Sequence, residues 1–329
     1  MSYQVFIKRY FLILIKKFKT VGTRTLKLIV VRIITFYVLI VTPSNPGFVT
    51  MGQKLGKEKL FKYINNFGFG TKTGIDLNGE SNGILFNINK MGPVETATTA
   101  FGQGISVTPI QQITAVSAVV NGGNLYKPYI VKSLMNESGA LLDYNEKVLV
   151  KKVISKDTSS LVRFTLESVV AKGSGHNAYI ENYRIGGKTG TAQTVENGRY
   201  SSSKYILSFI GFMPADDPEI VVYVAVQNAK GVVQYGGTVA APIARNIFLS
   251  AIDILDIKPD SEGIPKEYTW LDQKYVVVPD VVGMNIDDAK KALKGFNIEY
   301  SGEGETVIYE SPKGGMYAKE NGTIVLMLN

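Results

Sequence analysis

The sequence predicts an α+β fold in two domains, and three observations support this prediction. The chain has 329 residues, about twice the length of a typical domain of roughly 150 residues. Two apolar runs, 205–213 and 220–227, flank the turn residues 214–218, a pattern typical of an antiparallel hairpin. The stretch 258–265 is polar and rich in Pro and Gly, so we expect a linker there.

The composition excludes several kinds of chemistry. The chain contains no Cys, which excludes disulfides, thiolate nucleophiles, iron–sulfur clusters and cysteine zinc sites. His176 is the single histidine, so a zinc hydrolase lacks its second imidazole and a Ser-His-Asp triad would depend on this one residue. His176 lies in the turn-like segment 172–177, and we interpret it as a solvated loop residue. No metal site and no cofactor are predicted.

The formal net charge of +8 comes from the N-terminal arm, residues 1–43, which hold eight basic and no acidic residues. The rest of the chain is neutral overall, so no nucleic-acid partner is predicted. The arm is apolar at 10–15 and 28–41, but the second run is shorter than the ~20 residues that span a membrane. Four interpretations stay open: a membrane span, a signal peptide, a surface-lying basic segment, or an out-of-frame or fused sequence.

Helices and strands can be assigned in order along the rest of the chain. Apolar spacing predicts a helix over 57–67 that ends at Gly68. Thr108, Pro109 and Gln111 form a helix start with a capping box, and this helix should end at 121–123 and pack on a sheet. The run 220–226 is apolar without alternation, which predicts a strand covered by helices on both faces. A helix is expected over 243–255.

The short C-terminal part has the pattern of a compact module. A strand is expected at 275–278, a helix over 285–293, and further strands near 305–309 and 323–328. These assignments place a linker at 257–274 and a small α+β domain at 275–329. The larger domain then covers 44–256.

One local cluster, Gly186-Gly187-Lys188-Thr189-Gly190-Thr191-Ala192-Gln193, carries the chemistry. A phosphate-binding loop would require glycine at position 182, where this sequence has Asn182, so a nucleotide site is not predicted. The alternative is the Lys-Thr-Gly strand of penicillin-recognising serine enzymes. The cluster precedes the predicted hairpin and the C-terminal helix, as that interpretation requires.

Three further stretches lie around this cluster: Phe101-Gly102-Gln103-Gly104-Ile105-Ser106-Val107-Thr108-Pro109, Asn177-Ala178-Tyr179-Ile180 and Ser208-Phe209-Ile210-Gly211-Phe212. With these stretches and the cluster in this order, the chain resembles the C-terminal part of a class B penicillin-binding protein. The C-terminal module, with Val278-Pro279-Asp280-Val281-Val282-Gly283-Met284, resembles a PASTA domain. The combination is similar to sporulation-type members of the family. We expect an N-terminally truncated transpeptidase domain over about 45–255.

The resemblance implies peptidoglycan stem peptides or β-lactams as ligands, at the extracytoplasmic face of the cell membrane, which residues 1–43 would contact. Lys188 is a cation that can hold a carboxylate, and Thr189 adds a hydroxyl donor. Gly190 lets a substrate backbone approach closely, and the resemblance implies that the Thr191 N–H forms half of an oxyanion hole. The alternative is an exposed edge-strand lysine that limits aggregation.

The family pattern is incomplete in this sequence. A Ser-x-x-Lys nucleophile should precede the Lys-Thr-Gly strand, and none does; Ser201-Ser202-Ser203-Lys204 follows it, and we interpret that stretch as a loop. The Ser-x-Asn motif retains only Asn45, because Pro43 stands where its serine belongs. We therefore expect a fragment related to peptidoglycan cross-linking without catalysis of its own. The alternatives are a non-catalytic peptidoglycan-binding protein and a decayed gene product without function.

Overall fold

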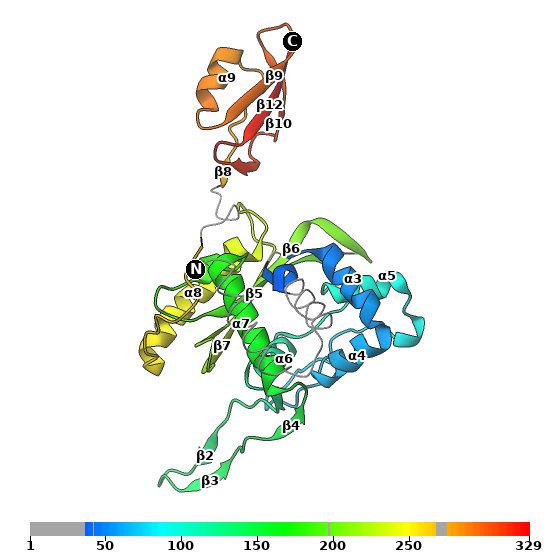
Figure 1. Ribbon diagram of the computed structural model, residues 1–329, viewed down its shortest axis with the longest axis vertical. Helices are drawn as coiled ribbons and strands as arrows, with labels where there is room; N and C mark the ends of the chain where they lie inside the picture. The colour runs from blue at the N-terminus through cyan, green and yellow to red at the C-terminus, as the bar shows by residue number, and fades with distance from the viewer. Residues whose placement is uncertain (1–36, 42, 197, 268–274) are drawn as a thin grey trace, which may run out of the picture. The chain divides into compact units, whose positions relative to one another are not determined.

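The computed structural model describes residues 37–41, 43–196, 198–267 and 275–329 (Figure 1). The chain divides into two compact units, one ending at Glu267 and the other beginning at Tyr268. Most of the predicted N-terminal arm, residues 1–36, lies outside the described residues. Its four interpretations therefore stay predictions.

A three-stranded antiparallel sheet forms the centre of the larger unit. Its strands are β5 (Gly186–Glu196), β6 (Arg199–Met213) and β7 (Ile220–Gln227), in the order β5-β6-β7. The predicted hairpin is confirmed as β6 and β7, and the predicted α+β class is confirmed with it. The Lys-Thr-Gly cluster lies on β5, at one edge of the sheet.

Helices cover both faces of this sheet. On one face α8 (Gly236–Leu255) packs Phe248 into a core that contains Phe209 of β6. On the other face α6 (Pro109–Val120) packs Val120 against Phe212. The predicted start of α6 is confirmed, because the Thr108 hydroxyl accepts from Gln111 N and the Gln111 side chain accepts from Thr108 N. This reciprocal pair satisfies two backbone donors that a helix start leaves free.

The prediction that helices flank the strand 220–226 on both faces is confirmed, because α8 and α6 both pack on β7, but few residues of the strand are fully buried. Helices contact the strand from both faces, but Val222 is the only residue of β7 that is buried, and Ala225 and Gln227 are exposed. The limited burial of β7 follows from its position in the sheet. It is an outer strand, and β6 is its only paired neighbour among the described residues. A continuous apolar run does not reveal whether a second strand lies beside it.

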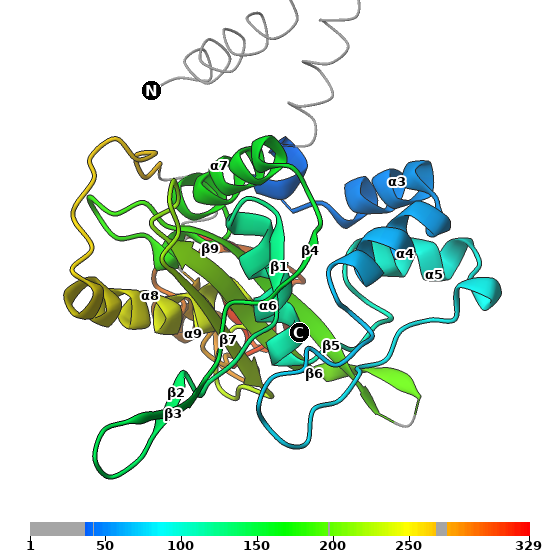
Figure 2. The ribbon, with the colours of Figure 1, turned by 90° about the horizontal axis from the view of Figure 1, so that it is seen from below.

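A lobe of short helices precedes the central sheet in the chain (Figures 1 and 2). Helix α7 lies against the sheet, at β5. The lobe consists of α3 (Asn45–Leu55), α4 (Lys57–Asn66), η1 (Ile88–Lys90) and α5 (Pro93–Ala100). The helix predicted over 57–67 is confirmed as α4. Helix α7 (Lys156–Lys172), capped by Ser155, contacts both α6 and β5. It was not predicted.

A hairpin arm projects from the larger unit (Figures 1 and 2). Strands β1 (Asn124–Tyr126) and β4 (Leu149–Lys152) pair at its base, and β2 (Ser133–Met135) and β3 (Leu141–Tyr144) pair farther out. The Asp76 carboxylate accepts hydrogen bonds from the backbone N–H groups of Ile130 and Val131, at 2.7 and 2.8 Å. A loop from the helical lobe thus fixes the start of the arm.

The first part of the predicted linker is packed rather than free. Ile257 is buried, Asp260 N donates to Asn182 O over 2.7 Å, and Glu267 N donates to Ala171 O over 3.0 Å. Residues 257–267 therefore belong to the larger unit, and the rest of the predicted linker lies outside the described residues. Proline and glycine content revealed the irregular backbone but not these contacts.

The C-terminal unit has its own sheet and core. Its elements are β8 (Tyr275–Val277), α9 (Ile286–Ala292), β9 (Asn297–Ser301), β10 (Val307–Ser311), β11 (Tyr317–Lys319) and β12 (Thr323–Leu328). The sheet order is β10-β12-β9, with β12 and β9 parallel, and β8 pairs with β11. The core includes Val281, Ala289, Leu293, Ile324 and Leu326. Strands β9 and β11 were missed by the sequence prediction.

Candidate functional site

The two glycines before Lys188 let β5 pack tightly on β6. A Cβ atom on Gly186 would lie 2.3 Å from the Phe212 ring, and one on Gly187 would lie 2.4 Å from the Phe209 ring. Since neighbouring residues of a strand face opposite sides of the sheet, each glycine accommodates one ring on one face. The two rings thus pack against the backbone of β5 and hold the strand in place immediately before Lys188.

Lys188 is partly buried, although it lies on an edge strand. Its Nζ donates to Thr189 O over 3.0 Å and lies 3.4 Å from Thr189 Oγ1. None of the ion pairs among the described residues includes Lys188. Burial without a counter-ion lowers the pKa of Lys188 to about 8. The alternative of an exposed, aggregation-limiting lysine is therefore wrong.

Thr189, the next residue of β5, contacts the loop between α7 and β5. The hydroxyls of Thr189 and Ser174 share a hydrogen bond of 3.0 Å. The same loop forms η2 (His176–Ala178), and the Asn177 side chain donates to Gly237 O at the start of α8. Ser174 was not among the predicted site residues, because no motif marks it.

Thr191 and Gly190 complete the predicted strand motif. The exposed Thr191 accepts a hydrogen bond at Oγ1 from Gly236 N over 3.2 Å, which ties β5 to the start of α8. Gly190 is explained by packing: a Cβ atom there would lie 2.5 Å from Ser208 Oγ on β6. The Ser208 hydroxyl in turn forms a hydrogen bond with Tyr223. Glycine is thus required by the neighbouring strand, whatever ligand approaches.

Asn45, the fifth predicted site residue, has no hydrogen bond to β5 among the described residues. It is exposed at the start of α3, where Ser44 caps the helix by accepting from Gly47 N over 3.3 Å. No hydrogen bond among the described residues joins Asn45 to Lys188 or Thr189. Its assignment to the site stays a prediction.

The late Ser-x-x-Lys sequence lies on a strand and not in the predicted loop. Ser201 and Lys204 both belong to β6. Ser201 Oγ accepts from the backbone N–H of Lys204 over 3.2 Å, while Lys204 Nζ pairs with Glu196 over 2.5 Å. The ammonium of Lys204 is therefore engaged by a carboxylate on β5, and this pair does not have the arrangement of a serine and its general base.

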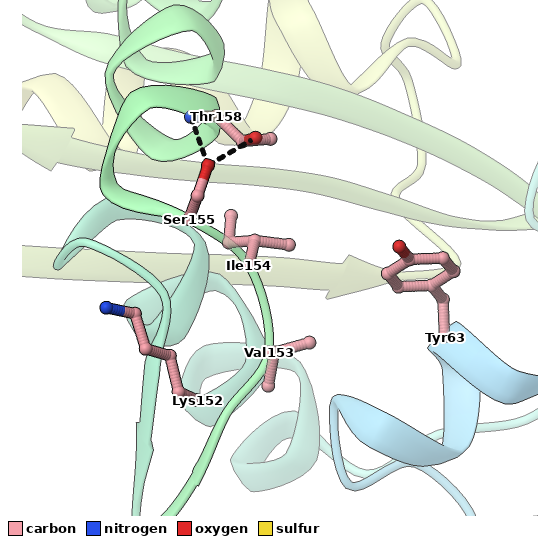
Figure 3. Close-up of a pocket in the computed structure, with 6 residues that line it drawn as sticks. All are labelled: Tyr63, Lys152, Val153, Ile154, Ser155 and Thr158. Atoms are coloured by element: carbon pink, nitrogen blue, oxygen red, sulfur yellow. Dashed lines mark hydrogen bonds between the residues drawn. The ribbon is translucent and has the colours of Figure 1, made fainter.

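The structure also contains a pocket away from β5. It has a volume of about 520 Å³ and lies at the N-terminus of α7, where Tyr63, Lys152 and the capping residue Ser155 are among its lining residues (Figure 3). None of the predicted site residues lines it. Among the described residues, no group of three or more His, Cys, Asp or Glu side chains could hold a metal ion.

Comparison with known protein families shows which family has this fold and this Lys-Thr-Gly strand. Residues 34–249 match the penicillin binding protein transpeptidase domain family, and residues 276–329 match the PASTA domain family. The chain belongs to the penicillin-binding transpeptidase family. It carries a PASTA domain after the transpeptidase region. The first match begins at residue 34, so part of the arm that we expected to be unlike the family belongs to it.

Individual relatives agree with this assignment. Stage V sporulation protein D of Bacillus subtilis is 53% identical over 295 residues, which cover 89% of this chain and 46% of the relative. A peptidoglycan D,D-transpeptidase FtsI homolog of Mesostigma viride is 33% identical over 242 residues, or 68% of this chain and 40% of the relative. The crystal structure of penicillin binding protein 3 of Mycobacterium tuberculosis in complex with ampicillin superposes with a TM-score of 0.64 at 28% identity. The superposition covers 71% of this chain and 54% of that one.

The penicillin-binding transpeptidase chain spans about half the length of the curated relatives it matches. Within that span it contains the Lys-Thr-Gly strand but no Ser-x-x-Lys before it. The site can therefore supply a partly buried cation, two hydroxyls and a strand edge that is unpaired among the described residues. These groups can bind a carboxylate, whereas acyl transfer also requires a nucleophile.

Proposed function

We propose that this chain binds the terminal carboxylate of peptidoglycan stem peptides, and β-lactams with a corresponding carboxylate, reversibly at the edge of β5. The observation that carries the proposal is the environment of Lys188. The partly buried ammonium group of Lys188 lies 3.4 Å from the Thr189 hydroxyl, which in turn shares a hydrogen bond with the Ser174 hydroxyl. Lys188 has no carboxylate partner among the described residues.

A ligand carboxylate would supply the missing partner. Burying a charge without a counter-ion is unfavourable, and a charge-assisted hydrogen bond to a carboxylate compensates for it. The outer edge of β5 is unpaired among the described residues, so its backbone N–H and C=O groups can pair with an extended peptide. A stem peptide has both features, an extended backbone and a terminal carboxylate.

Covalent chemistry by this chain alone is not part of the proposal. A serine needs an adjacent base to attack a carbonyl group, and no Ser-x-x-Lys precedes Lys188. The expected activity is binding related to peptidoglycan cross-linking in cell-wall or spore-cortex synthesis, at the extracytoplasmic face of the membrane. The PASTA domain would contribute contacts to the same polymer.

Two measurements on the purified chain test this proposal. Intact-mass spectrometry after long exposure to benzylpenicillin should show no adduct, and an NMR titration with an acyl-D-Ala-D-Ala peptide should give a dissociation constant on the order of millimolar. Lys188→Met should abolish the binding, whereas Lys204→Met, which changes an exposed lysine of the same sheet, should preserve it.

Each alternative has its own outcome. A stoichiometric acyl adduct would overturn the non-covalent assignment, and an adduct on Ser201 would show that the late Ser-x-x-Lys is a nucleophile. Binding that survives Lys188→Met would move the ligand site elsewhere, for example to the PASTA domain. A folded chain that binds neither ligand would support a product without function.

A further inference from the structure

One segment between the two family matches packs against the larger unit. Residues 257–267 follow the transpeptidase match, which ends at residue 249, and precede the PASTA match, which begins at residue 276. They contact α7 and the loop between α7 and β5, residues 173–185. We call residues 257–267 the strap and residues 173–185 the Ser174 loop.

The inner part of the strap, up to Ile264, is held by buried groups. Ile257 belongs to the core that α8 covers, and Asp260 N donates to Asn182 O over 2.7 Å. Ile264 N donates to the Glu167 carboxylate over 3.2 Å, and the Glu167 side chain is only 4% exposed. Because buried contacts open at a high free-energy cost, this part of the strap should stay in place during local opening.

The outer end of the strap, Lys266 and Glu267, contacts the chain on both sides of Ser174. Glu267 N donates to Ala171 O over 3.0 Å, three residues before Ser174. The Tyr179 hydroxyl, five residues after Ser174, has a hydrogen bond with the backbone of Lys266. The outer end therefore bridges two positions between which Ser174 lies.

These outer contacts are accessible to water. The Glu267 carboxylate pairs with Lys172, the last residue of α7, and the two side chains are 46% and 23% exposed. Exposed ion pairs contribute little to stability, so the outer end should open before the inner part does. The larger unit ends at Glu267, so a pull on the chain from the C-terminal unit acts on this end first.

Release of the outer end would act on Ser174 through the end of α7. Gly173 N and Gly175 N both donate to Val169 O, over 3.0 and 3.1 Å. Ser174 lies between these two glycines, so a shift of the last turn of α7 displaces it. Its hydroxyl would then lose the hydrogen bond to Thr189, which limits the directions in which the Thr189 hydroxyl can point.

We propose that the outer end of the strap holds the Ser174 loop in the arrangement that binds a carboxylate at β5, and that lifting this end weakens the binding. The inference rests on the proposed function, because Thr189 is one of the groups that would hold the ligand. Two states of the chain differ in it: the outer end is seated or lifted, while the inner part and the sheet are unchanged. The strap is thus a regulatory element that connects the chain beyond Glu267 to the carboxylate site.

The first test needs no ligand. Glu267→Pro in the full-length chain removes both the N–H that donates to Ala171 O and the carboxylate that pairs with Lys172. Hydrogen exchange at Gly175 and Ala178, whose amides are hydrogen-bonded in buried residues, should then accelerate at least about fivefold. The amides of β6 should keep their protection, which verifies that the variant is folded.

Two further variants accompany this measurement. Tyr179→Phe removes the hydroxyl that bonds to Lys266 and keeps the ring, so it should accelerate exchange at the same two amides. The matched control is Lys258→Met, which breaks an exposed ion pair with Asp256 near the start of the strap. It should leave exchange in the Ser174 loop unchanged.

The second test measures binding of an acyl-D-Ala-D-Ala peptide by NMR titration. Glu267→Pro should raise the dissociation constant at least about threefold, because a smaller fraction of the chain is competent to bind. Lys258→Met should not change it. In a chain that already carries Ser174→Ala, adding Glu267→Pro should have no further effect, since both changes remove the same hydrogen bond.

Several results would overturn the proposal. These are unchanged exchange at Gly175 and Ala178 in Glu267→Pro, faster exchange throughout β6, and additive effects of Glu267→Pro and Ser174→Ala on binding. An effect of Lys258→Met as large as that of Glu267→Pro would also overturn it. A wild-type chain that binds no peptide would refute the proposed function alone, and the exchange measurements would then decide whether the strap holds the Ser174 loop.

Discussion

Arg184 and Glu167 form a two-pronged ion pair in which Arg184 Nε and Nη2 each donate to one carboxylate oxygen over 3.0 Å. The Glu167 side chain is 4% exposed and also accepts from Ile264 N over 3.2 Å. Asp216 and Asp260 lie 3.4 and 3.5 Å from Arg184 Nη1. Arg184 lies two residues before β5 begins. Its guanidinium therefore connects α7, the turn before β7 and the packed segment 257–267.

Arg184→Met should destabilise the larger unit by about 3 kcal/mol at neutral pH, because it leaves the buried Glu167 carboxylate without its cation. Urea denaturation followed by fluorescence would measure the change. Glu196→Gln breaks an exposed pair with Lys204 and should cost less than about 1 kcal/mol. The prediction fails if the double variant Arg184→Met with Glu167→Leu is as unstable as Arg184→Met alone.

The same ion pair shows where prediction from sequence stops. Helix α7 was missed because the side it buries includes Thr165, Glu167 and Ser168, which do not form an apolar stripe. Glu167 can be buried only because Arg184 and Ile264 N satisfy it, and these partners are 17 and 97 residues away. Local apolar periodicity contains no information about such partners.

The site was predicted where its determinants are local in sequence. The Lys-Thr-Gly cluster and the hairpin that follows it predicted an edge strand, and Lys188, Thr189, Gly190 and Thr191 all lie on that strand, β5. Their role in ligand binding stays a prediction. The partial burial of Lys188, and the fact that no described carboxylate pairs with it, were not predicted, since both depend on segments distant in sequence. Ser174 was missed for the same reason, because it reaches Thr189 only through the loop after α7.

The lowered pKa of Lys188 predicts an unusual dependence of stability on pH. Burial lowers this pKa from 10.5 to about 8. Between pH 8 and 10.5 the unfolded chain therefore binds more protons than the folded one, and stability should rise with pH in this window. Below pH 8 both states are protonated, so the unfavourable burial of the ammonium persists in full.

Comparison with Lys188→Met isolates this contribution. The difference in unfolding free energy between the variant and the wild type should be largest below pH 8 and should shrink as the pH approaches 10.5. Urea titrations at several pH values would measure it. A difference that stays constant from pH 7 to 10 would show that Lys188 is well solvated or neutralised in the folded chain.

Asp76 should control the opening of the hairpin arm. Hydrogen bonds from the N–H groups of Val131 and Ile130 lower the pKa of this carboxyl group below its ordinary value of 3.8. Since a depressed carboxyl pKa stabilises the ionised, folded form, the contact should hold at neutral pH and be lost only as the pH falls below about 4.

Hydrogen exchange measured by NMR provides the test at single amides. Asp76→Ala should accelerate exchange at Ile130 and Val131 at neutral pH while the amides of β6 stay protected. Asp143→Ala, which changes an exposed carboxylate farther out on the arm, serves as the control. Equal protection of Ile130 and Val131 in the wild type and in Asp76→Ala would contradict the role given to this contact.

The C-terminal unit should fold as an isolated piece of residues 275–329. It has a core of its own, although a domain of about 55 residues usually has a margin of only a few kcal/mol. Glu310 is 2% exposed, accepts from Val281 N over 3.0 Å and also accepts from Gly314 N. Glu310→Ala leaves two backbone donors without this partner, at about 1–3 kcal/mol each, so it should remove most of that margin.

Dispersed amide signals in an NMR spectrum of the isolated wild-type piece would demonstrate folding, and Glu310→Ala should collapse them. Glu299→Ala is the matched control, because Glu299 is an exposed glutamate on β9 of the same sheet, and its spectrum should stay dispersed. A wild-type piece without dispersion would mean that the nine buried residues of the core are insufficient without the rest of the chain. A folded Glu310→Ala variant would mean that solvent replaces the carboxylate at Val281 and Gly314 at little cost.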